Sequence, residues 1–342
     1  MLEVRNLKTY FKTKAGYAHA VDDVSFTLQP GENFGLVGES GCGKTTAAKS
    51  IIKLLPPNGQ IMGGQILYNG RDLVPLAPDE MQKVRWKEIS VISQSAMNSL
   101  DPVYKVGDQI VEAIQAHETV GRGEALDRAR DLFRLVGIDA KRLNDYPHQY
   151  SGGMKQRSII AMSLALNPGL IIADEPTTAL DVIVQDQILR RIKSLLETHK
   201  ASMILITHDI SVVAEMCDSV AVMYAGKVME LGDVITVFKR PFHPYTLGLQ
   251  NAFPNVHGAK QDLISIPGSP PKLVNPPSGC RFAARCPFAL PLCREQEPAM
   301  VQVGPNHTAA CHRLDEVEWM RVEATKKGNW DKVEVPYGHN GR

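Results

Sequence analysis

Alternating apolar and polar residues mark two segments near the start of the chain. Within residues 2–11 and 21–28, apolar side chains recur at every second position over most of each segment. This period is typical of strands that bury one face. We therefore expect a small antiparallel sheet at the beginning of the fold.

Short continuous apolar runs follow, and they are typical of parallel strands buried on both faces. They occupy residues 33–37, 89–93, 170–174, 203–207 and 220–224. Between several of them, apolar residues recur at helical spacing, as in 45–55, which two prolines end, and in 184–196. Strands that alternate with helices predict an α/β fold.

Two further regions depart from this alternation. Residues 95–155 contain no strand run but two helical patterns, 106–117 and 125–136, the second closed by Gly137. Past residue 236, frequent prolines interrupt any long element. We therefore divide the chain into three regions. They are an α/β core (1–94 and 156–236), an inserted helical subdomain (95–155) and a loop-rich C-terminal appendage (237–342).

Composition and charge narrow the possible partners. The chain has 342 residues, of which 44% are apolar and 22% charged, and 38 Lys and Arg balance 37 Asp and Glu. No overall field therefore attracts nucleic acid or an anionic membrane. The first residues carry an acid and no apolar core, and no run approaches the roughly 20 apolar residues of a membrane span. We expect any membrane work to be done from the cytosolic side.

A glycine-rich segment at residues 38–45, GESGCGKT, follows a predicted strand and opens a predicted helix. This is the context of a phosphate loop, in which backbone N–H groups and the helix N-terminus surround the phosphates. The lysine would reach the β- and γ-phosphates and the threonine would ligate Mg²⁺. A plain glycine-rich turn is the alternative, and the motif alone indicates only a phosphate binder. The expected nucleotide contacts are Gly38, Ser40, Gly41, Cys42, Gly43, Lys44, Thr45 and Thr46.

Two carboxylates end the strand 170–174. Asp174 is placed to hold Mg²⁺, and Glu175 can polarise an attacking water as general base. Acidic pairs also end strands without any catalytic role.

A third motif, Ser151-Gly152-Gly153, precedes the apolar stretch 158–166. Its serine is a good N-cap, and a helix start of this kind is a second anion site. Taken alone, it could be a cap and nothing more.

The order of these motifs resembles the ATP-binding-cassette family over residues 1 to about 236. It runs from the phosphate loop through Gln94, Ser151-Gly152-Gly153 and the Asp-Glu pair to Ala-Leu-Asp at 179–181 and Thr-His-Asp at 207–209. The resemblance implies a P-loop NTPase fold. It also implies that two cassettes pack head to tail, so that ATP on the phosphate loop of one chain meets the Ser-Gly-Gly segment of the other.

The same resemblance implies roles for single residues. Gln94 would contact both Mg²⁺ and the attacking water. Thr45 and Asp174 would also bind the Mg²⁺ ion. His208 would hydrogen-bond the γ-phosphate, and Asp181 would connect the two sites of the dimer.

An aromatic ring from the first strand commonly stacks on adenine in this family. Phe11 is the first choice, with Tyr10 or Tyr17 as alternatives. One departure is Tyr150, since the family usually has leucine before Ser-Gly-Gly. The phosphate-contacting atoms are retained, so we expect activity.

The C-terminal appendage resembles that of the ATPase subunits of dipeptide and oligopeptide importers. The similarity lies in His243-Pro244-Tyr245-Thr246, the Pro-Gly-Ser-Pro-Pro stretch at 267–271 and the terminal cysteines. It implies ATP-driven peptide uptake at the cytoplasmic face of the cell membrane. The expected partners are a second ATPase subunit, either a different chain or an identical one, two permease subunits and an extracytoplasmic solute-binding protein. The same machinery could instead import a sugar, a metal chelate or another small solute.

Four cysteines near the C-terminus are separated by 5, 6 and 17 residues, unlike the C-x2-C pairs of zinc ribbons. Four thiolates suit one tetrahedral ion or one cubane cluster. The family resemblance implies a [4Fe-4S] cluster, while zinc and unliganded or disulfide-bonded thiols remain alternatives. Arg281 and Arg285 could offset the charge of a cluster. The four cysteines are Cys280, Cys286, Cys293 and Cys311.

Two other classes of cassette ATPase fit the sequence less well. Chromosome-maintenance and DNA-repair cassettes separate their nucleotide motifs by long coiled coils, whereas about 105 residues lie between Thr45 and Ser151. Translation-associated ATPases carry two cassettes in one chain, and this chain has a single phosphate loop. We therefore expect no nucleic-acid partner.

Overall fold

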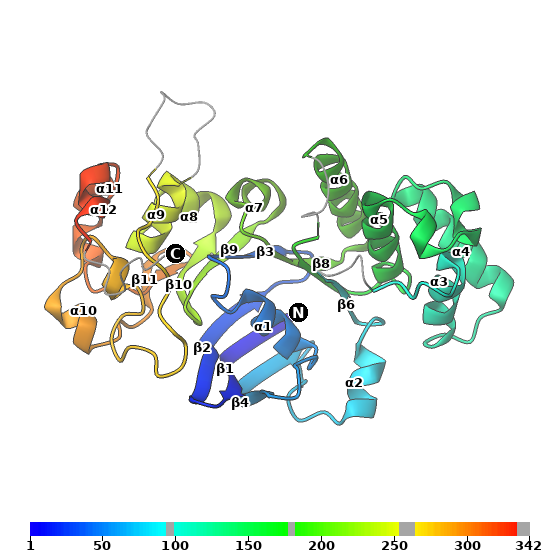
Figure 1. Cartoon of the computed structure of the whole chain (residues 1–342), viewed down its shortest axis with the longest axis horizontal. Coiled ribbons are helices and arrows are strands. Elements are labelled where there is room, and N and C mark those ends of the chain that lie inside the picture. The colour runs from blue at the N-terminus through cyan, green and yellow to red at the C-terminus, as the bar shows by residue number, and fades with distance from the viewer. Residues whose placement is uncertain (94–98, 177–181, 253–263, 334–342) are drawn as a thin grey trace. The chain divides into compact units, whose positions relative to one another are not determined.

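The computed structural model describes residues 1–93, 99–176, 182–252 and 264–333 (Figure 1). The chain forms two compact units. The first comprises Met1–Thr27, Gly35–Val74 and Thr207–Arg342, and the second comprises Leu28–Phe34 and Pro75–Ile206. The strand β3 (Asn33–Val37), which precedes the phosphate loop, is divided between them.

A four-stranded sheet in the order β2-β1-β4-β5 opens the first unit. The expected first two strands are confirmed, as β1 and β2, and β1 pairs antiparallel with β4 from its first residues to Phe11, which lies opposite Gly59. β4 was not predicted, because two adjacent glycines interrupt its pattern. The strands are β1 (Leu2–Thr13), β2 (Gly16–Leu28), β4 (Gly59–Tyr68) and β5 (Arg71–Asp72).

The second set of strands in this unit lies in the order β11-β12-β10-β9. The strand predicted from the apolar run at 220–224 is confirmed as β9, and it pairs antiparallel with β10. The reason is the two-residue turn between them, in which Ala225 and Gly226 both have positive φ, 47° and 86°. The strands are β9 (Ser219–Tyr224), β10 (Lys227–Asp233), β11 (Val301–Gly304) and β12 (His307–Ala309).

In the first unit, α1 follows the phosphate loop, α7 and α8 stand before β9 and after β10, and the other helices belong to the C-terminal extension. This extension contains more regular structure than its prolines suggest, because Pro244 and Pro291 stand in the first turn of a helix, where no N–H is needed. The helices are α1 (Lys44–Ile51), α7 (Ile210–Met216), α8 (Val234–Lys239), α9 (Pro244–Asn251), α10 (Pro291–Glu295), α11 (Val317–Ala324) and α12 (Lys327–Asp331).

The second unit contains three of the predicted parallel strands. β6 (Ile89–Ile92) pairs with β7 (Leu170–Asp174), which pairs with β8 (Ser202–Ile206), all in parallel. Every residue of β7 and β8 is buried, as their continuous apolar runs predict.

The helices of this unit include the predicted insertion. Figure 1 shows α3, α4 and α5 side by side, and α4 ends before Gly137, whose φ is +70°. Among the described helices none is long and apolar enough to span a membrane. The helices are α2 (Pro78–Val84), α3 (Val106–Gln115), α4 (Arg122–Leu135), α5 (Gly152–Ser163) and α6 (Val182–His199).

Candidate functional site

The phosphate loop connects β3 with α1, and its backbone is packed too closely for side chains at two positions. Gly38 has φ +144°, and a Cβ there would lie 2.1 Å from the carbonyl oxygen of Met223. Gly43, the N-cap of α1, has φ +109°, and its Cβ would lie 2.1 Å from the carbonyl oxygen of Ala20. Gly38 and Gly43 are therefore required by both conformation and space.

Lys44 lies inside the loop rather than in solvent. Its buried Nζ donates to the carbonyl oxygens of Gly38, at 2.6 Å, and Glu39, at 3.0 Å. Cys42 is also buried, and burial raises the pKa of its thiol. Of the remaining predicted loop contacts, Thr45 and Thr46 are half-buried, and Ser40 and Gly41 are exposed.

The carboxylate pair ends a strand of the second unit, as predicted. Asp174 is the buried last residue of β7. Glu175 follows with φ +48°, a left-handed conformation that is uncommon for a residue with a side chain, and its N–H donates to the carbonyl oxygen of Ile206 at 2.8 Å. Such conformations cluster at functional sites, where the surrounding structure enforces them.

The Ser-Gly-Gly segment forms the start of α5. Ser151 is the N-cap, and its Oγ accepts a hydrogen bond from the N–H of Met154 at 3.3 Å. Gly152 and Gly153 are the first helical residues, and Ser151 and Gly152 are exposed to solvent. This helix start can therefore present backbone N–H groups to an anion.

Tyr150 departs from the family pattern for a structural reason. Its ring is buried, its hydroxyl donates to the carbonyl oxygen of Arg142 at 2.7 Å, and burial raises its pKa. This bond fastens Tyr150 to the backbone at Arg142, and Ser151 keeps its capping bond to the N–H of Met154.

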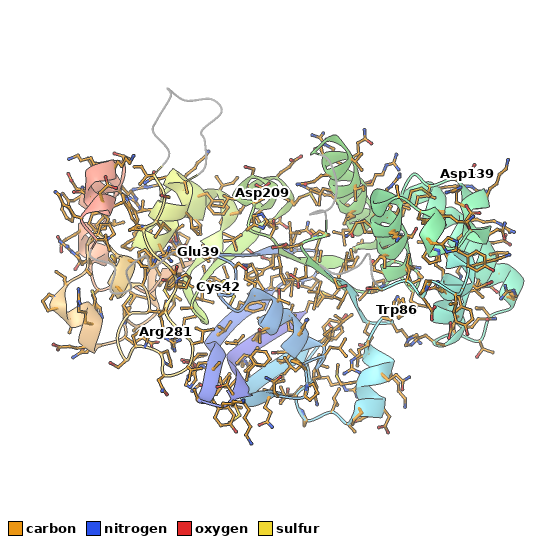
Figure 2. All side chains as sticks on the ribbon, in the orientation of Figure 1. Glu39, Cys42, Trp86, Asp139, Asp209 and Arg281 are labelled. Atoms are coloured by element: carbon orange, nitrogen blue, oxygen red, sulfur yellow. The ribbon has the colours of Figure 1, made fainter. Side chains whose placement is uncertain are left out.

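His208 belongs to the first unit and is exposed, one residue before the cap of α7. The cap is Asp209, whose carboxylate accepts from the N–H of Ser211 at 2.9 Å (Figure 2). Lys44, Thr45 and His208 thus belong to the first unit, and Asp174, Glu175 and Ser151 to the second. Two further predicted residues, Gln94 and Asp181, lie outside the described residues.

The aromatic candidates for adenine stacking differ in their surroundings. The ring of Phe11 lies against Gly59, so that a Cβ at Gly59 would be 2.7 Å from it. Tyr10 stacks on His19 with ring centroids 3.9 Å apart, and its hydroxyl donates to Asp22 at 2.7 Å. Tyr17 is 39% exposed. Phe11 therefore stays the prediction for this role.

The four C-terminal cysteines line one small cavity, but no three Cys, His, Asp or Glu side chains among the described residues are arranged to hold a metal ion. All four thiols are free. The arrangement of the described side chains therefore does not show the predicted metal centre. Burial raises the pKa to about 12 for Cys280 and about 11 for Cys311, and raises that of Cys286 well above its usual range.

Each of these sulfurs receives a backbone N–H. The N–H of Arg313 lies 3.4 Å from Cys311 Sγ, and the N–H of Leu290 lies 3.4 Å from Cys293 Sγ. The backbone N–H of Phe282 donates to Cys280, and the backbone N–H of Phe288 donates to Cys286. Such amides favour thiolates over thiols, as a thiolate-ligated centre requires.

One ion pair at the phosphate loop was not predicted from the sequence. Glu39 is bound by Arg285, the residue before Cys286. The two residues are 246 positions apart, so no local pattern could have paired them.

Comparison with known proteins places these motifs in a family. The ABC transporter family model matches residues 21–178, and the model for the oligopeptide/dipeptide transporter C-terminal region matches 229–293. A probable peptide ABC transporter ATP-binding protein of Sinorhizobium fredii is 48% identical over 93% of this chain and 96% of its own. The oligopeptide transport ATP-binding protein OppD of Bacillus subtilis is 49% identical over 90% of this chain and 87% of its own.

This chain belongs to the ATP-binding proteins of ABC peptide transporters. A solved dimeric ATP-binding cassette bound to ADP and phosphate superposes with a TM-score of 0.63 and 26% identity, over 68% of this chain and 99% of its own. The remaining share of this peptide-transporter ATP-binding protein has no counterpart in that cassette. The C-terminal family match includes three of the four clustered cysteines, Cys280, Cys286 and Cys293.

Proposed function

We propose that this chain hydrolyses MgATP to drive peptide import through membrane permease subunits. The observation that carries the proposal is the similarity to peptide-transporter ATP-binding proteins over more than nine tenths of the chain, C-terminal extension included. An extension shared with these relatives favours peptides over sugars or metal chelates as cargo. The partners would be a second ATPase subunit, two permeases and an extracytoplasmic solute-binding protein, at the cytoplasmic face of the cell membrane.

The nucleotide site follows from the family motifs. Lys44 would bind the β- and γ-phosphates, and Thr45, Asp174 and Gln94 would hold Mg²⁺. Glu175 would act as general base on the attacking water. The buried ammonium of Lys44 already lies within the loop, and this position supports its role.

The second half of the site would come from the partner cassette. Its Ser151-Gly152-Gly153 helix start would add N–H groups and a helix dipole to the γ-phosphate. His208 would hydrogen-bond the γ-phosphate, and Asp181 would link the two sites. ATP would then favour the closed dimer, because each phosphate is fully bound only when both chains meet.

Replacing the proposed base tests this assignment. Glu175→Gln keeps the size of the side chain but cannot accept a proton, so turnover should fall by about 10² to 10⁴-fold while MgATP binding persists. Steady-state phosphate release and equilibrium ATP binding measure the two effects. Glu197→Gln, which removes an exposed carboxylate from α6, is the matched control and should hydrolyse ATP normally. Unimpaired hydrolysis by Glu175→Gln would reject this residue as base.

Transport itself needs the assembled complex. Co-purified with its permeases in vesicles, the protein should accumulate dipeptides or oligopeptides in an ATP-dependent manner when the binding protein is present. Uptake of a sugar or metal chelate without any peptide uptake would contradict the assignment of cargo.

We further propose that the four C-terminal cysteines hold a [4Fe-4S] cluster with a structural role. The donor set supports it, since four free thiols line one cavity and each sulfur receives a backbone amide. A single zinc ion would require all four sulfurs within about 2.3 Å of one point. In a cubane each thiolate binds a different iron, so the four sulfurs need not meet at one point.

Metal analysis distinguishes these cofactors. Protein purified without oxygen should be brown and contain about four irons per chain. Cys286→Ser should lower the iron content, whereas Cys217→Ser, which changes a buried cysteine outside the cavity, should not. Colourless protein with one zinc per chain would establish the alternative.

A further inference from the structure

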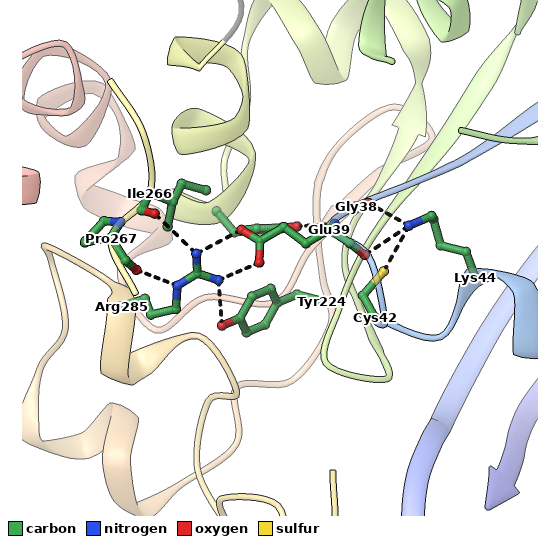
Figure 3. Close-up of polar contacts among 9 residues, drawn as sticks. Gly38, Glu39, Cys42, Lys44, Tyr224, Ile266, Pro267 and Arg285 are labelled. Atoms are coloured by element: carbon green, nitrogen blue, oxygen red, sulfur yellow. Dashed lines mark hydrogen bonds and ion pairs between the residues drawn. The ribbon is translucent and has the colours of Figure 1, made fainter. Parts of the chain in front are cut away.

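Arg285 is a buried arginine whose guanidinium uses all its donors. Its side chain is 4% exposed, and its Nε donates to the carbonyl oxygen of Pro267 at 2.7 Å. The other four N–H groups reach both carboxylate oxygens of Glu39, the hydroxyl of Tyr224 and the carbonyl oxygen of Ile266 (Figure 3). An arginine has five N–H donors, so the site is complete and fits no other side chain.

The partner of Arg285 is the second residue of the phosphate loop. Glu39 is held at three points. Arg285 binds its carboxylate at 2.7 and 2.9 Å, and Lys44 binds its carbonyl oxygen at 3.0 Å (Figure 3). Its N–H donates to the hydroxyl oxygen of Tyr245 at 2.8 Å. The side chain of Glu39 is 25% exposed, so water competes little for this pair. The position of the first peptide groups of the loop is thus fixed from the C-terminal extension.

This contact matters because the loop binds by geometry. Its N–H groups must already point at the phosphates, or ATP binding must supply the free energy to order them. Lys44 donates to Gly38 and Glu39, so displacing Glu39 would also displace the ammonium. Arg285 is the residue before Cys286, which places the tether beside the cysteine cavity.

We propose that Arg285 is a positioning residue for ATP binding, which it supports by holding Glu39 and thereby the phosphate loop in its binding conformation. The proposal rests on the proposed role of that loop. It assigns the C-terminal extension a part in nucleotide affinity, in addition to any role of its cysteines.

The test compares two buried arginines in the full chain, purified without oxygen. Arg285→Lys retains the charge but has three donors in place of five, so it cannot bridge Glu39 to the 266–267 backbone. We expect its Kd for MgATP to rise about tenfold, with kcat changed less than about twofold. The control is Arg281→Lys: Arg281 is 3% exposed and follows Cys280, but binds Asp22 and the carbonyl oxygen of Ala225 instead of the phosphate loop. Its Kd should stay within about twofold of the unmodified chain.

Further readouts separate positioning from a general loss of structure. Iron per chain in Arg285→Lys should equal that of the unmodified protein, and its melting temperature should fall no more than that of Arg281→Lys. Glu39→Gln should weaken MgATP binding similarly, and the double variant Glu39→Gln/Arg285→Lys should be no weaker than either single one. The single variant Glu39→Gln also keeps the test decisive should Arg285→Lys fail to fold.

Three results would overturn the proposal: unchanged ATP affinity in Arg285→Lys, additive effects in the double variant, or loss of iron in parallel with loss of affinity. Lys44→Ala tests the underlying assumption separately. If it binds MgATP normally, the phosphate-loop assignment itself fails, whereas a loss confined to Lys44→Ala rejects only the role of Arg285.

Discussion

At the scale of single residues, the phosphate loop is determined by space as much as by chemistry. Gly41 and Gly43 both have positive φ, 78° and 109°, but a Cβ at Gly41 would meet nothing within 4 Å. A Cβ at Gly43 would lie 2.1 Å from the carbonyl oxygen of Ala20. A side chain at Gly41 would therefore cause backbone strain alone, whereas a side chain at Gly43 would cause strain and a steric clash.

This contrast predicts different losses for two matched substitutions. Gly41→Ala should lower the free energy of unfolding by about 1–2 kcal/mol, the usual strain of a left-handed alanine. Gly43→Ala adds a clash with backbone, so it should cost more stability and weaken MgATP binding by at least about tenfold. Denaturant unfolding and calorimetric ATP titration measure both quantities. Equal losses in the two variants would contradict the steric argument.

Residue patterns predicted the local parts of the site and not the distant ones. The phosphate loop, the Asp174-Glu175 pair and the Ser151 cap each occupy a few consecutive residues, whose order and spacing carry the signal. The pair of Glu39 and Arg285 has no such signal, because its partners come together only in the folded chain. The left-handed backbone of Glu175 is likewise invisible in the sequence.

At the scale of secondary-structure elements, strongly periodic segments were predicted well. The parallel strands β6, β7 and β8 match their apolar runs, with differences of about one residue at their ends. The cap of α5 was predicted correctly at Ser151, although the first turn of the helix contains glycines and polar residues that carry no apolar period. β10 was missed because its turn, Ala-Gly, lacks the usual asparagine or aspartate.

The N-terminus of α5 provides a prediction at this scale. Ser151→Asp keeps an N-cap acceptor for the N–H of Met154, so the free energy of unfolding should change by less than about 0.5 kcal/mol. Its negative charge would repel the partner's γ-phosphate, so ATP hydrolysis should fall by at least about tenfold.

Chemical denaturation and phosphate release in the assembled transporter check this pair of outcomes. Ser151→Ala removes the cap and should lower the free energy of unfolding by about 1 kcal/mol. It shows the purely structural effect for comparison. Normal turnover by Ser151→Asp would mean that the serine is only a cap.

At the scale of the whole chain, a buried glutamate joins the core to the C-terminal extension. Glu230 of β10 is fully buried, and its carboxylate accepts from the N–H groups of Phe242 and His243, at 2.8 and 3.0 Å. It also lies 2.7 Å from Nε2 of His307 in β12. The extension is thus fastened to the strands of the first unit by hydrogen bonds that are buried or partly buried.

Truncating this side chain should destabilise the protein strongly. Glu230→Ala leaves two buried amides and a buried imidazole without their acceptor, and should lower the free energy of unfolding by about 3–5 kcal/mol. Glu230→Gln retains one acceptor oxygen and should cost less. Equilibrium unfolding of the full chain tests this order, and a loss below 1 kcal/mol in Glu230→Ala would refute it.

The distance along the sequence between Glu39 and Arg285 has a consequence for biosynthesis. While the ribosome is still translating the cassette, the guanidinium that fixes the loop does not exist, and it is added 246 residues after Glu39. The first strands also depend on late residues, because the N–H of His19 donates to the carbonyl oxygen of Leu273. A nascent chain therefore gains this tether of its phosphate loop only near the end of translation, so a product terminated before Arg285 should bind MgATP more weakly than the full chain.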